Sequence, residues 1–136
     1  MFPCFPYFGL TSFFQILFLA LVKRREEDFM LIKIITTTSS RDEAEKIGSV
    51  LVEEGLAACC QVSGPILSIY PWKGIIERNE EWMLVIKTIK DMYGACEKRI
   101  EEMHSYECPQ IVAFNAEAVY RPYMDWIRGW IEEKRS

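Results

Sequence analysis

The sequence is short of the residues that mark several common functional classes. It has one histidine and 7 glycines in 136 residues, and no glycines follow the spacing of a phosphate-binding loop. Lys and Arg number 16 against 20 Asp and Glu, and this net charge of −4 disfavours binding to nucleic acid. The 5 cysteines are odd in number and lack metal-knuckle spacing, so we expect reduced thiols in a cytosol rather than a disulfide framework.

The first 29 residues differ in composition from the rest of the chain. Residues 1–22 carry no charge and include an apolar run at 13–22, which Lys23, Arg24 and Arg25 follow. Hydropathy allows a marginal transmembrane helix that would leave everything after it in the cytoplasm. A secretory signal is disfavoured, because no positive charge precedes the apolar run and no small-residue cleavage site follows it.

A third interpretation of this segment is favoured. Residues 25–29 can be encoded by a purine-rich AGGAGG tract just ahead of the Met30 codon, which is the arrangement of a bacterial ribosome-binding site. We therefore expect translation to begin at Met30, with residues 1–29 either untranslated or a leader without selected structure. A membrane anchor is the alternative. The folded domain is expected to span residues 30–136.

From Met30 onward, short strands and helices are expected to alternate. Residues 30–37 are apolar and β-branched and predict a strand. Ser40 with Glu43 three residues later is a capping box that begins a helix, and Gly55 is placed to end it in the left-handed conformation. The apolar stripe of this helix is Ala44, Ile47 and Leu51.

A long hairpin is expected in the middle of the chain. Residues 58–62 lead into a second extended stretch at 66–72, Lys73 and Gly74 form the turn, and residues 80–88 return. Pro71 cannot donate to a ladder, so its strand is expected at an edge or a bulge. The remaining elements are a helix over 91–103, a strand over 110–116 and a last helix that begins near Pro122.

This order of elements predicts a ferredoxin-like α+β sandwich of βαββαβ type with an extra C-terminal helix. Helices then cover one face of an antiparallel sheet. The other face is left open, and an open apolar face in a domain of this size needs a partner.

Three blocks of sequence, each at an expected element boundary, carry a resemblance to a known family. They read LAACCQV at 56–62, SIYPWKGIIE at 68–77 and HSYECPQI at 104–111. In this order they resemble the CutA divalent-cation-tolerance family over about residues 30–131. The resemblance implies a cytoplasmic homotrimer that acts in tolerance of divalent cations such as copper by binding rather than catalysis. The expected trimer interface or cleft residues are Tyr70, Trp72, Trp82, Lys87 and Tyr106.

The candidate metal-binding residues are His104, Glu107 and Cys108. Imidazole, carboxylate and thiolate are donors that copper or zinc prefers, and no other cofactor is expected. The alternative for His104 is structural, since a histidine at a helix C-terminus complements the helix dipole. No nucleic-acid or membrane partner is expected.

The resemblance also implies the loss of one particular copper site. The family site uses a cysteine in the first strand, a histidine and an acidic residue, and these positions align with Thr36, Met103 and Gln110. Only Met103 is a soft donor. Cation binding would then need His104, Glu107, Cys108 or cysteines of a neighbouring subunit. Cys59 and Cys60 are adjacent on a strand, so they point to opposite faces and are not expected to hold one metal together.

The sequence suggests two other functional classes, an enzyme and a sensor of small ligands. An enzyme would use Cys108 as nucleophile, His104 as base and Glu107 as orienter, but no oxyanion hole or phosphate-binding loop accompanies them. A trimeric sensor of small anionic ligands, similar to the PII signalling proteins, is the alternative function. Its intersubunit cleft would be lined by Lys73, Arg78, Lys87 and Tyr106.

Overall fold

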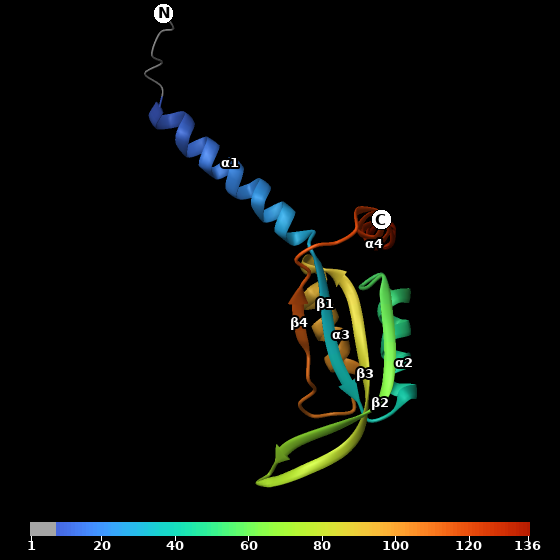
Figure 1. The fold of residues 1–136 in the computed structure, drawn as a ribbon. Helices are drawn as coiled ribbons and strands as arrows, with labels where there is room; N and C mark the ends of the chain where they lie inside the picture. Colours follow the sequence, from blue (N-terminus) through green and yellow to red (C-terminus); the bar gives the residue numbers. More distant parts are fainter. Residues whose placement is uncertain (1–7) are drawn as a thin grey trace, which may run out of the picture.

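The computed structural model describes residues 8–136, in which a helix precedes a folded α+β domain (Figure 1). The domain has a four-stranded antiparallel sheet in the order β2-β3-β1-β4. This topology confirms the predicted ferredoxin-like sandwich with an extra C-terminal helix. The elements are α1 (Phe8–Asp28), β1 (Leu31–Thr38), α2 (Arg41–Glu53), β2 (Cys59–Trp72), β3 (Ile75–Ile89), the short 3-10 helix η1 (Lys90–Met92), α3 (Tyr93–Met103), β4 (Val112–Asn115) and α4 (Arg121–Arg135).

Helix α1 extends away from the domain (Figure 1). The sequence led us to expect no selected structure here, whereas residues 8–28 are helical, and large apolar side chains such as Phe13 and Leu19 are exposed on the helix. Over residues 8–136, no helix combines the length and the apolar composition that crossing a membrane requires. The first seven residues of the expected leader, with Cys4 among them, lie outside the described residues. Initiation at Met30 stays a prediction.

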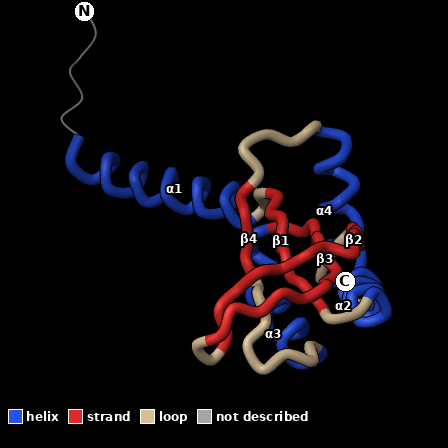
Figure 2. Tube along the Cα trace, turned by 60° about the horizontal axis from the view of Figure 1, so that its bottom comes forward, coloured by secondary structure: helices blue, strands red, loops and turns tan. Residues whose placement is uncertain are grey.

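The core lies between the sheet and helices α2 and α3, which cover the same face (Figures 1 and 2). Alternate residues of β1 face the helices, and Ile32 and Ile34 are fully buried there beside Leu84 and Ile86 of β3. Helix α2 begins as predicted, because the Ser40 hydroxyl accepts a hydrogen bond from the Glu43 backbone N–H at 3.2 Å. The predicted stripe of α2 is buried and consists of Ala44, Ile47 and Leu51.

Helices α2 and α3 leave the opposite face of the sheet uncovered. The strand register places Ile35 of β1, Val85 of β3 and Val112 and Phe114 of β4 on this face. Phe114 is 54% exposed and Val112 is 41% exposed. We call these four residues the open apolar face.

The hairpin of β2 and β3 is longer than the sequence predicted, since β3 begins at Ile75 rather than at residue 80. Its turn is Lys73 and Gly74, both with positive φ, as a two-residue hairpin turn requires. A register shift between Ser63 and Ile66 interrupts the pairing, and the outer half of the hairpin bends away from the sheet (Figure 1). Strand β2 is an edge strand, which confirms the placement predicted from Pro71.

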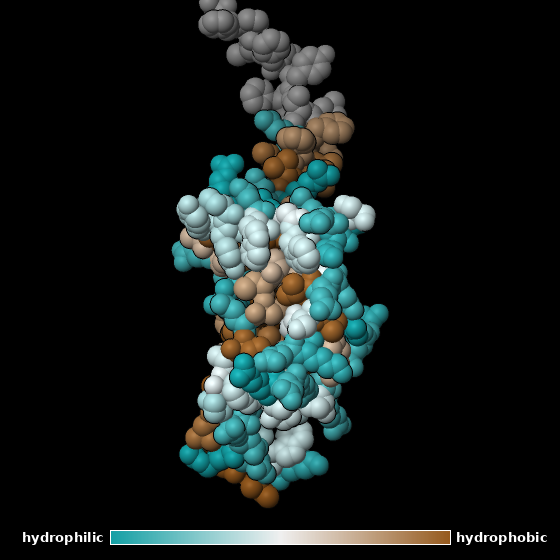
Figure 3. Space-filling view, turned by 90° about the vertical axis from the view of Figure 1, so that its right-hand side faces the viewer, coloured by the Kyte–Doolittle hydropathy of each residue, from teal (hydrophilic) through white to brown (hydrophobic). Residues whose placement is uncertain are grey.

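Apolar side chains gather at the hairpin tip. Ile75 and Ile76 are both exposed there, and Trp72 precedes them. The side view in Figure 3 shows hydrophobic atoms at its lower end, the level of this tip, at its upper end, the level of α1, and in a patch across its middle, with hydrophilic atoms around them. The tip is therefore a second apolar surface besides the open apolar face.

Replacing Thr36 by valine is expected to stabilise the domain by about 1 kcal/mol. The Thr36 side chain is fully buried on the helix-facing side of β1, and its hydroxyl oxygen has no hydrogen-bond partner in the structure. Valine keeps the β-branched shape and removes the buried polar atom. Urea unfolding of both proteins measures the difference, with Thr88→Val as the control. Because the Thr88 hydroxyl donates to the Leu56 carbonyl at 2.7 Å, that control should lose stability. A loss for Thr36→Val would contradict the prediction.

Candidate functional site

A groove with a volume of about 820 Å³ lies between the bent hairpin and the loop that joins α3 to β4. The hairpin turn and this loop lie side by side in Figure 2. The groove is on the side of the sheet opposite α2 and α3, because Glu77, Glu81 and Thr37 share that face. Its lining is Thr37, Ser68, Ile69, Tyr70, Trp72, Glu77, Asn79, Glu81, Ser105, Tyr106, Glu107, Cys108 and Gln110.

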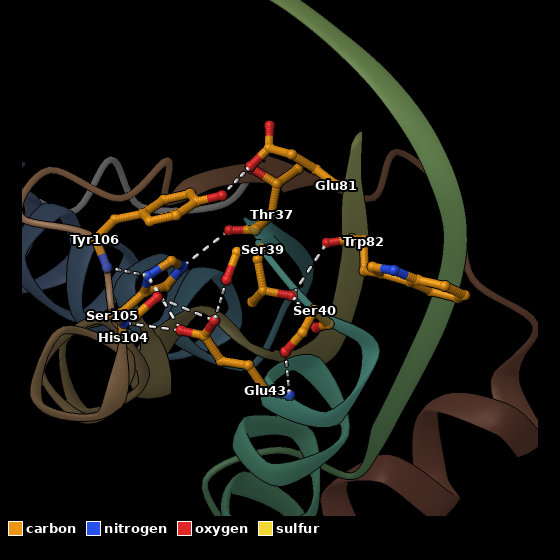
Figure 4. A network of polar contacts seen from close by, with 10 residues as sticks. Thr37, Ser39, Ser40, Glu43, Glu81, Trp82, His104, Ser105 and Tyr106 are labelled. Carbon is orange, nitrogen blue, oxygen red and sulfur yellow. Dashed lines mark hydrogen bonds and ion pairs between the residues drawn. The ribbon is translucent and has the colours of Figure 1, made fainter. Parts of the chain in front are cut away.

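Two contacts fix the polar groups of the groove. The Tyr106 hydroxyl donates to Oε2 of Glu81 at 2.8 Å, across from the loop to β3 (Figure 4). On the hairpin, the Asn79 side-chain amide donates to the Tyr70 hydroxyl at 2.7 Å. Burial, followed by the contact with Glu81, raises the pKa of Tyr106, so this phenol stays neutral and acts as a donor.

The charge of the groove has one sign. Glu77, Glu81 and Glu107 line it, and no lysine or arginine does. The side chains of Tyr70, Trp72 and Tyr106 supply aromatic surface between these acids. The groove is therefore suited to a cation and repels anions.

His104 holds the loop in place from behind the groove (Figure 4). Its Nδ1 lies 3.1 Å from the Tyr106 backbone nitrogen, whose N–H donates to it, so Nδ1 carries no proton. The proton is then on Nε2, which donates to the Thr37 carbonyl at 2.9 Å. The imidazole is fully buried and both nitrogens are engaged. His104 thus positions Tyr106, whose hydroxyl donates to Glu81.

Glu43 is the second anchor of the same loop. Its carboxylate accepts the Ser105 backbone N–H at 2.8 Å and the Ser105 hydroxyl at 3.0 Å, and Ser39 also donates to it. Burial alone would raise the pKa of Glu43. The hydrogen bonds from Ser105 and Ser39 outweigh that effect and hold the pKa below its ordinary value.

A Glu43→Gln variant is expected to lose about 1–2 kcal/mol of stability at pH 7, because charge-assisted bonds to Ser105 are lost. A carboxyl whose pKa is lowered by folding stabilises the fold above its unfolded pKa, and this contribution disappears as pH falls through the folded value. The difference between parent and variant should therefore shrink on acidification from pH 7 to pH 3. Urea titrations at both pH values measure it.

The matched control for this prediction is Glu45→Gln on the same helix. Glu45 pairs only with Arg41, and both side chains are at least half exposed, so the expected change is within about 0.5 kcal/mol. Equal losses for the two variants, or a Glu43 effect that persists at pH 3, would contradict the assignment of Glu43 as a loop anchor.

The metal-binding roles of His104, Glu107 and Cys108 stay predictions, and the structure shows how these three side chains lie within one chain. Over residues 8–136, no three His, Cys, Asp or Glu side chains are grouped so that they could hold a metal ion. His104 points inward with both nitrogens engaged, whereas Glu107 and Cys108 are exposed at the groove. In the enzyme alternative, His104 would act as the base for Cys108. Both of its nitrogens are engaged in hydrogen bonds, so this set has no free base.

The three positions aligned with the family copper site have different environments. Thr36 is buried in the core, Met103 packs at the end of α3 against the core, and Gln110 lines the groove. Among the other cysteines, burial raises the pKa of Cys60 and Cys96 to about 12, with neighbouring cysteines adding to the effect at Cys60. Neither offers a thiolate ligand at neutral pH.

The predicted interface and cleft residues fall into two sets. Tyr70, Trp72 and Tyr106 line the groove. Trp82 lies instead over Gly64, where an added Cβ would come within 2.7 Å of its ring, and Lys87 lies 5.8 Å from the Tyr123 ring.

The predicted anion cleft is not assembled within one chain. Of its four residues, Tyr106 lines the groove, while Lys73, Arg78 and Lys87 do not. The lining that replaces them is acidic, so the geometry within one chain does not favour the anion-sensing alternative.

Sequence reasoning missed Glu43, Glu81 and Asn79 as site residues. Glu43 was identified only as a capping residue, and its side chain contacts Ser105, 62 residues later in the chain. A signal for Glu81 was available, since it directly precedes the apolar run at 82–86, and strand alternation places it on the same face as Met83 and Val85.

The antiparallel sheet, the two helices on one face and the groove beneath a bent hairpin define a ferredoxin-like binding domain. A family model described as CutA1 divalent ion tolerance protein matches residues 32–129. The divalent-cation tolerance protein CutA of Thermus thermophilus is 35% identical over 95 residues, which cover 70% of this chain and 92% of the relative. The chain belongs to the CutA1 divalent ion tolerance protein family.

Solved structures agree with this assignment. The structure described as the periplasmic divalent cation tolerance protein CutA from Archaeoglobus fulgidus aligns with a TM-score of 0.73 at 34% identity, covering 75% of this chain and 99% of that one. CutA from Xylella fastidiosa also gives a TM-score of 0.73 at 34% identity, covering 74% of this chain and 97% of that one.

Proposed function

We propose that this protein contributes to tolerance of divalent cations, copper among them, by binding them as a cytoplasmic homotrimer without catalysis. The observation that carries the proposal is the lining of the groove, which has three glutamates and one cysteine and no lysine or arginine. Such a lining attracts cations. The names of these relatives, which refer to divalent-cation tolerance, support the same function for this chain.

Two apolar surfaces support assembly into a trimer. The open apolar face exposes Phe114 and Val112, and the hairpin tip exposes Ile75 and Ile76. Both surfaces are on projecting or uncovered parts of the sheet, where only another protein surface removes them from water. Packing of identical copies around a symmetry axis would cover both surfaces at once.

A metal ion held at the groove needs donors from more than one copy. A single chain exposes Cys108 and Glu107 at the groove, and two donors do not complete the coordination of copper or zinc. Thiolate and carboxylate contributed by neighbouring copies would supply the missing ligands. The trimer is therefore part of the proposed cation site.

A non-catalytic role is supported by the state of the histidine. His104 is engaged by the Thr37 carbonyl and the Tyr106 N–H, so it cannot act as a base toward Cys108 without dismantling the loop.

Copper titration of the purified protein tests the proposal. Because Cys108 is the exposed thiol of the groove, Cys108→Ala is expected to weaken copper binding at least tenfold, which is about 1.4 kcal/mol or more. Its melting without metal should stay close to that of the parent. Calorimetry and elemental analysis of the trimer give the affinity and the stoichiometry.

The matched control is Cys59→Ser, which changes a half-buried cysteine outside the groove lining and should leave copper binding unchanged. If His104→Ala abolished binding while Cys108→Ala retained it, the predicted histidine ligand would be right and the groove site wrong. Absence of copper binding by the parent trimer would remove the metal-binding part of the proposal.

A further inference from the structure

Glu81 is a buried carboxylate without a cationic partner. It is 6% exposed, yet among residues 8–136 no lysine, arginine or histidine nitrogen lies within 4.0 Å of its oxygens. Among the described residues, its carboxylate has one hydrogen bond, which the Tyr106 hydroxyl donates to Oε2. Buried carboxylates are ordinarily paired, because desolvation of an isolated charge is costly. The position of Glu81 in the groove lining therefore calls for a cation from outside the chain.

The surroundings of Glu81 identify the kind of cation. Tyr70, Trp72 and Tyr106 line the same groove, and aromatic faces attract cations while accepting apolar groups. A volume of about 820 Å³ is in the range of sites for small organic molecules and far exceeds a metal ion. The acids nearest in the lining, Glu77 and Glu107, add negative potential without closing the groove.

We propose that this groove binds a small organic cation of guanidinium or ammonium type, whose head lies against Oε1 of Glu81 and whose body packs on Tyr70 and Trp72. The metal donors proposed at the same groove are Cys108 and Glu107, whereas the organic ligand uses Glu81 and does not depend on metal binding. A guanidinium suits the site well, since its planar face stacks on aromatic rings while its edge donates to a carboxylate. Tyr106 keeps Oε2 occupied, which leaves one carboxylate oxygen for the ligand.

Calorimetric titration with three probes of similar size tests the ligand class. Butylguanidinium carries the charge, butylurea has nearly the same shape without it, and pentanoate carries the opposite charge. We expect butylguanidinium to bind at least tenfold more tightly than butylurea, and pentanoate to show no binding. Equal affinity for the first two probes, or a preference for pentanoate, would overturn the proposal.

Two neighbouring glutamates of β3 provide a matched pair of variants. Glu81→Gln removes the charge and keeps an acceptor for the Tyr106 hydroxyl, so butylguanidinium affinity should fall at least tenfold. Glu80→Gln changes an exposed residue that pairs with Leu67 and does not line the groove, so the affinity should stay unchanged. Similar effects of both variants would reduce the role of Glu81 to general electrostatics and contradict the site.

Melting of the same variants separates a ligand site from a subunit contact. If Glu81 binds a ligand and is unpaired in the free protein, removal of its charge should leave the melting temperature of the free protein unchanged or raise it. If a lysine or arginine of a second copy pairs with Glu81 in the assembly, Glu81→Gln should instead lower the melting temperature and the assembled mass. That result would overturn the proposal of an organic ligand.

Discussion

Gly55→Ala is expected to destabilise the domain by about 2–4 kcal/mol. Gly55 follows α2 with φ of 73°, in the left-handed region that side chains rarely adopt. An added Cβ would also lie 2.1 Å from the Cβ of Lys134 in the last turn of α4. A Cβ is fixed by its backbone, so α4 itself would have to move. Urea unfolding of the parent and the variant measures the loss.

Gly129→Ala is the matched control within α4. Gly129 lies in the middle of the helix with ordinary helical geometry, and nothing lies within 4 Å of an added Cβ. Alanine should stabilise the protein there by about 0.5–1 kcal/mol. Opposite signs for the two glycines are the expected outcome. A neutral Gly55→Ala variant would mean that the contact between the end of α2 and the last turn of α4 is absent in solution.

The features predicted well from the sequence are those with local causes. Ser40 and Glu43 are three residues apart, and Gly55 lies one residue beyond the C-cap of the helix that they begin. The chemistry of each is set by backbone geometry within a single turn, so no knowledge of the rest of the fold is needed. The ferredoxin-like class followed from the order of the elements along the chain.

The start of β4 was predicted wrongly, because it depends on a contact between residues distant in the sequence. The sequence predicted a strand over 110–116, whereas β4 begins at Val112, opposite Ile35. Continuing this register would place Gln110 opposite Thr37. The Thr37 carbonyl instead accepts the Nε2–H of His104, and the chain before Val112 forms a wall of the groove. His104, which is 67 residues from Thr37 in the sequence, thus occupies the carbonyl that a longer β4 would pair with.

The groove itself depends on contacts between distant parts of the chain. Glu81 and Tyr106 are 25 residues apart, and the hairpin must bend at its register shift to lie beside the loop after α3. The residue types at 104–108 identified candidate metal donors, but they did not predict where each side chain points. The imidazole of His104 contacts the Thr37 carbonyl and the Tyr106 N–H, and Glu81, to which the sequence assigned no role, lines the groove.

Phe114→Asp is expected to convert the proposed trimer into monomers, with the mass in light scattering falling from three chains to one. Phe114 is in the edge strand β4 and is 54% exposed on the open apolar face, next to Lys33 of β1 in the register. A face that is buried between copies would have to desolvate the new carboxylate of each chain, at a cost of several kcal/mol per charge. Each chain should keep its own core, because position 114 does not contribute to it.

Tyr120→Asp is the control, because it places the same charge on another exposed aromatic residue outside the open apolar face. Tyr120 is 78% exposed at the N-cap of α4, a position where aspartate is favoured, so neither the fold nor the mass should change. Circular dichroism distinguishes dissociation from unfolding in both variants. If the parent were already monomeric at micromolar concentration, or if Phe114→Asp remained a trimer, the open apolar face would not be the assembly surface, and the hairpin tip at Ile75 and Ile76 would be the surface left to test.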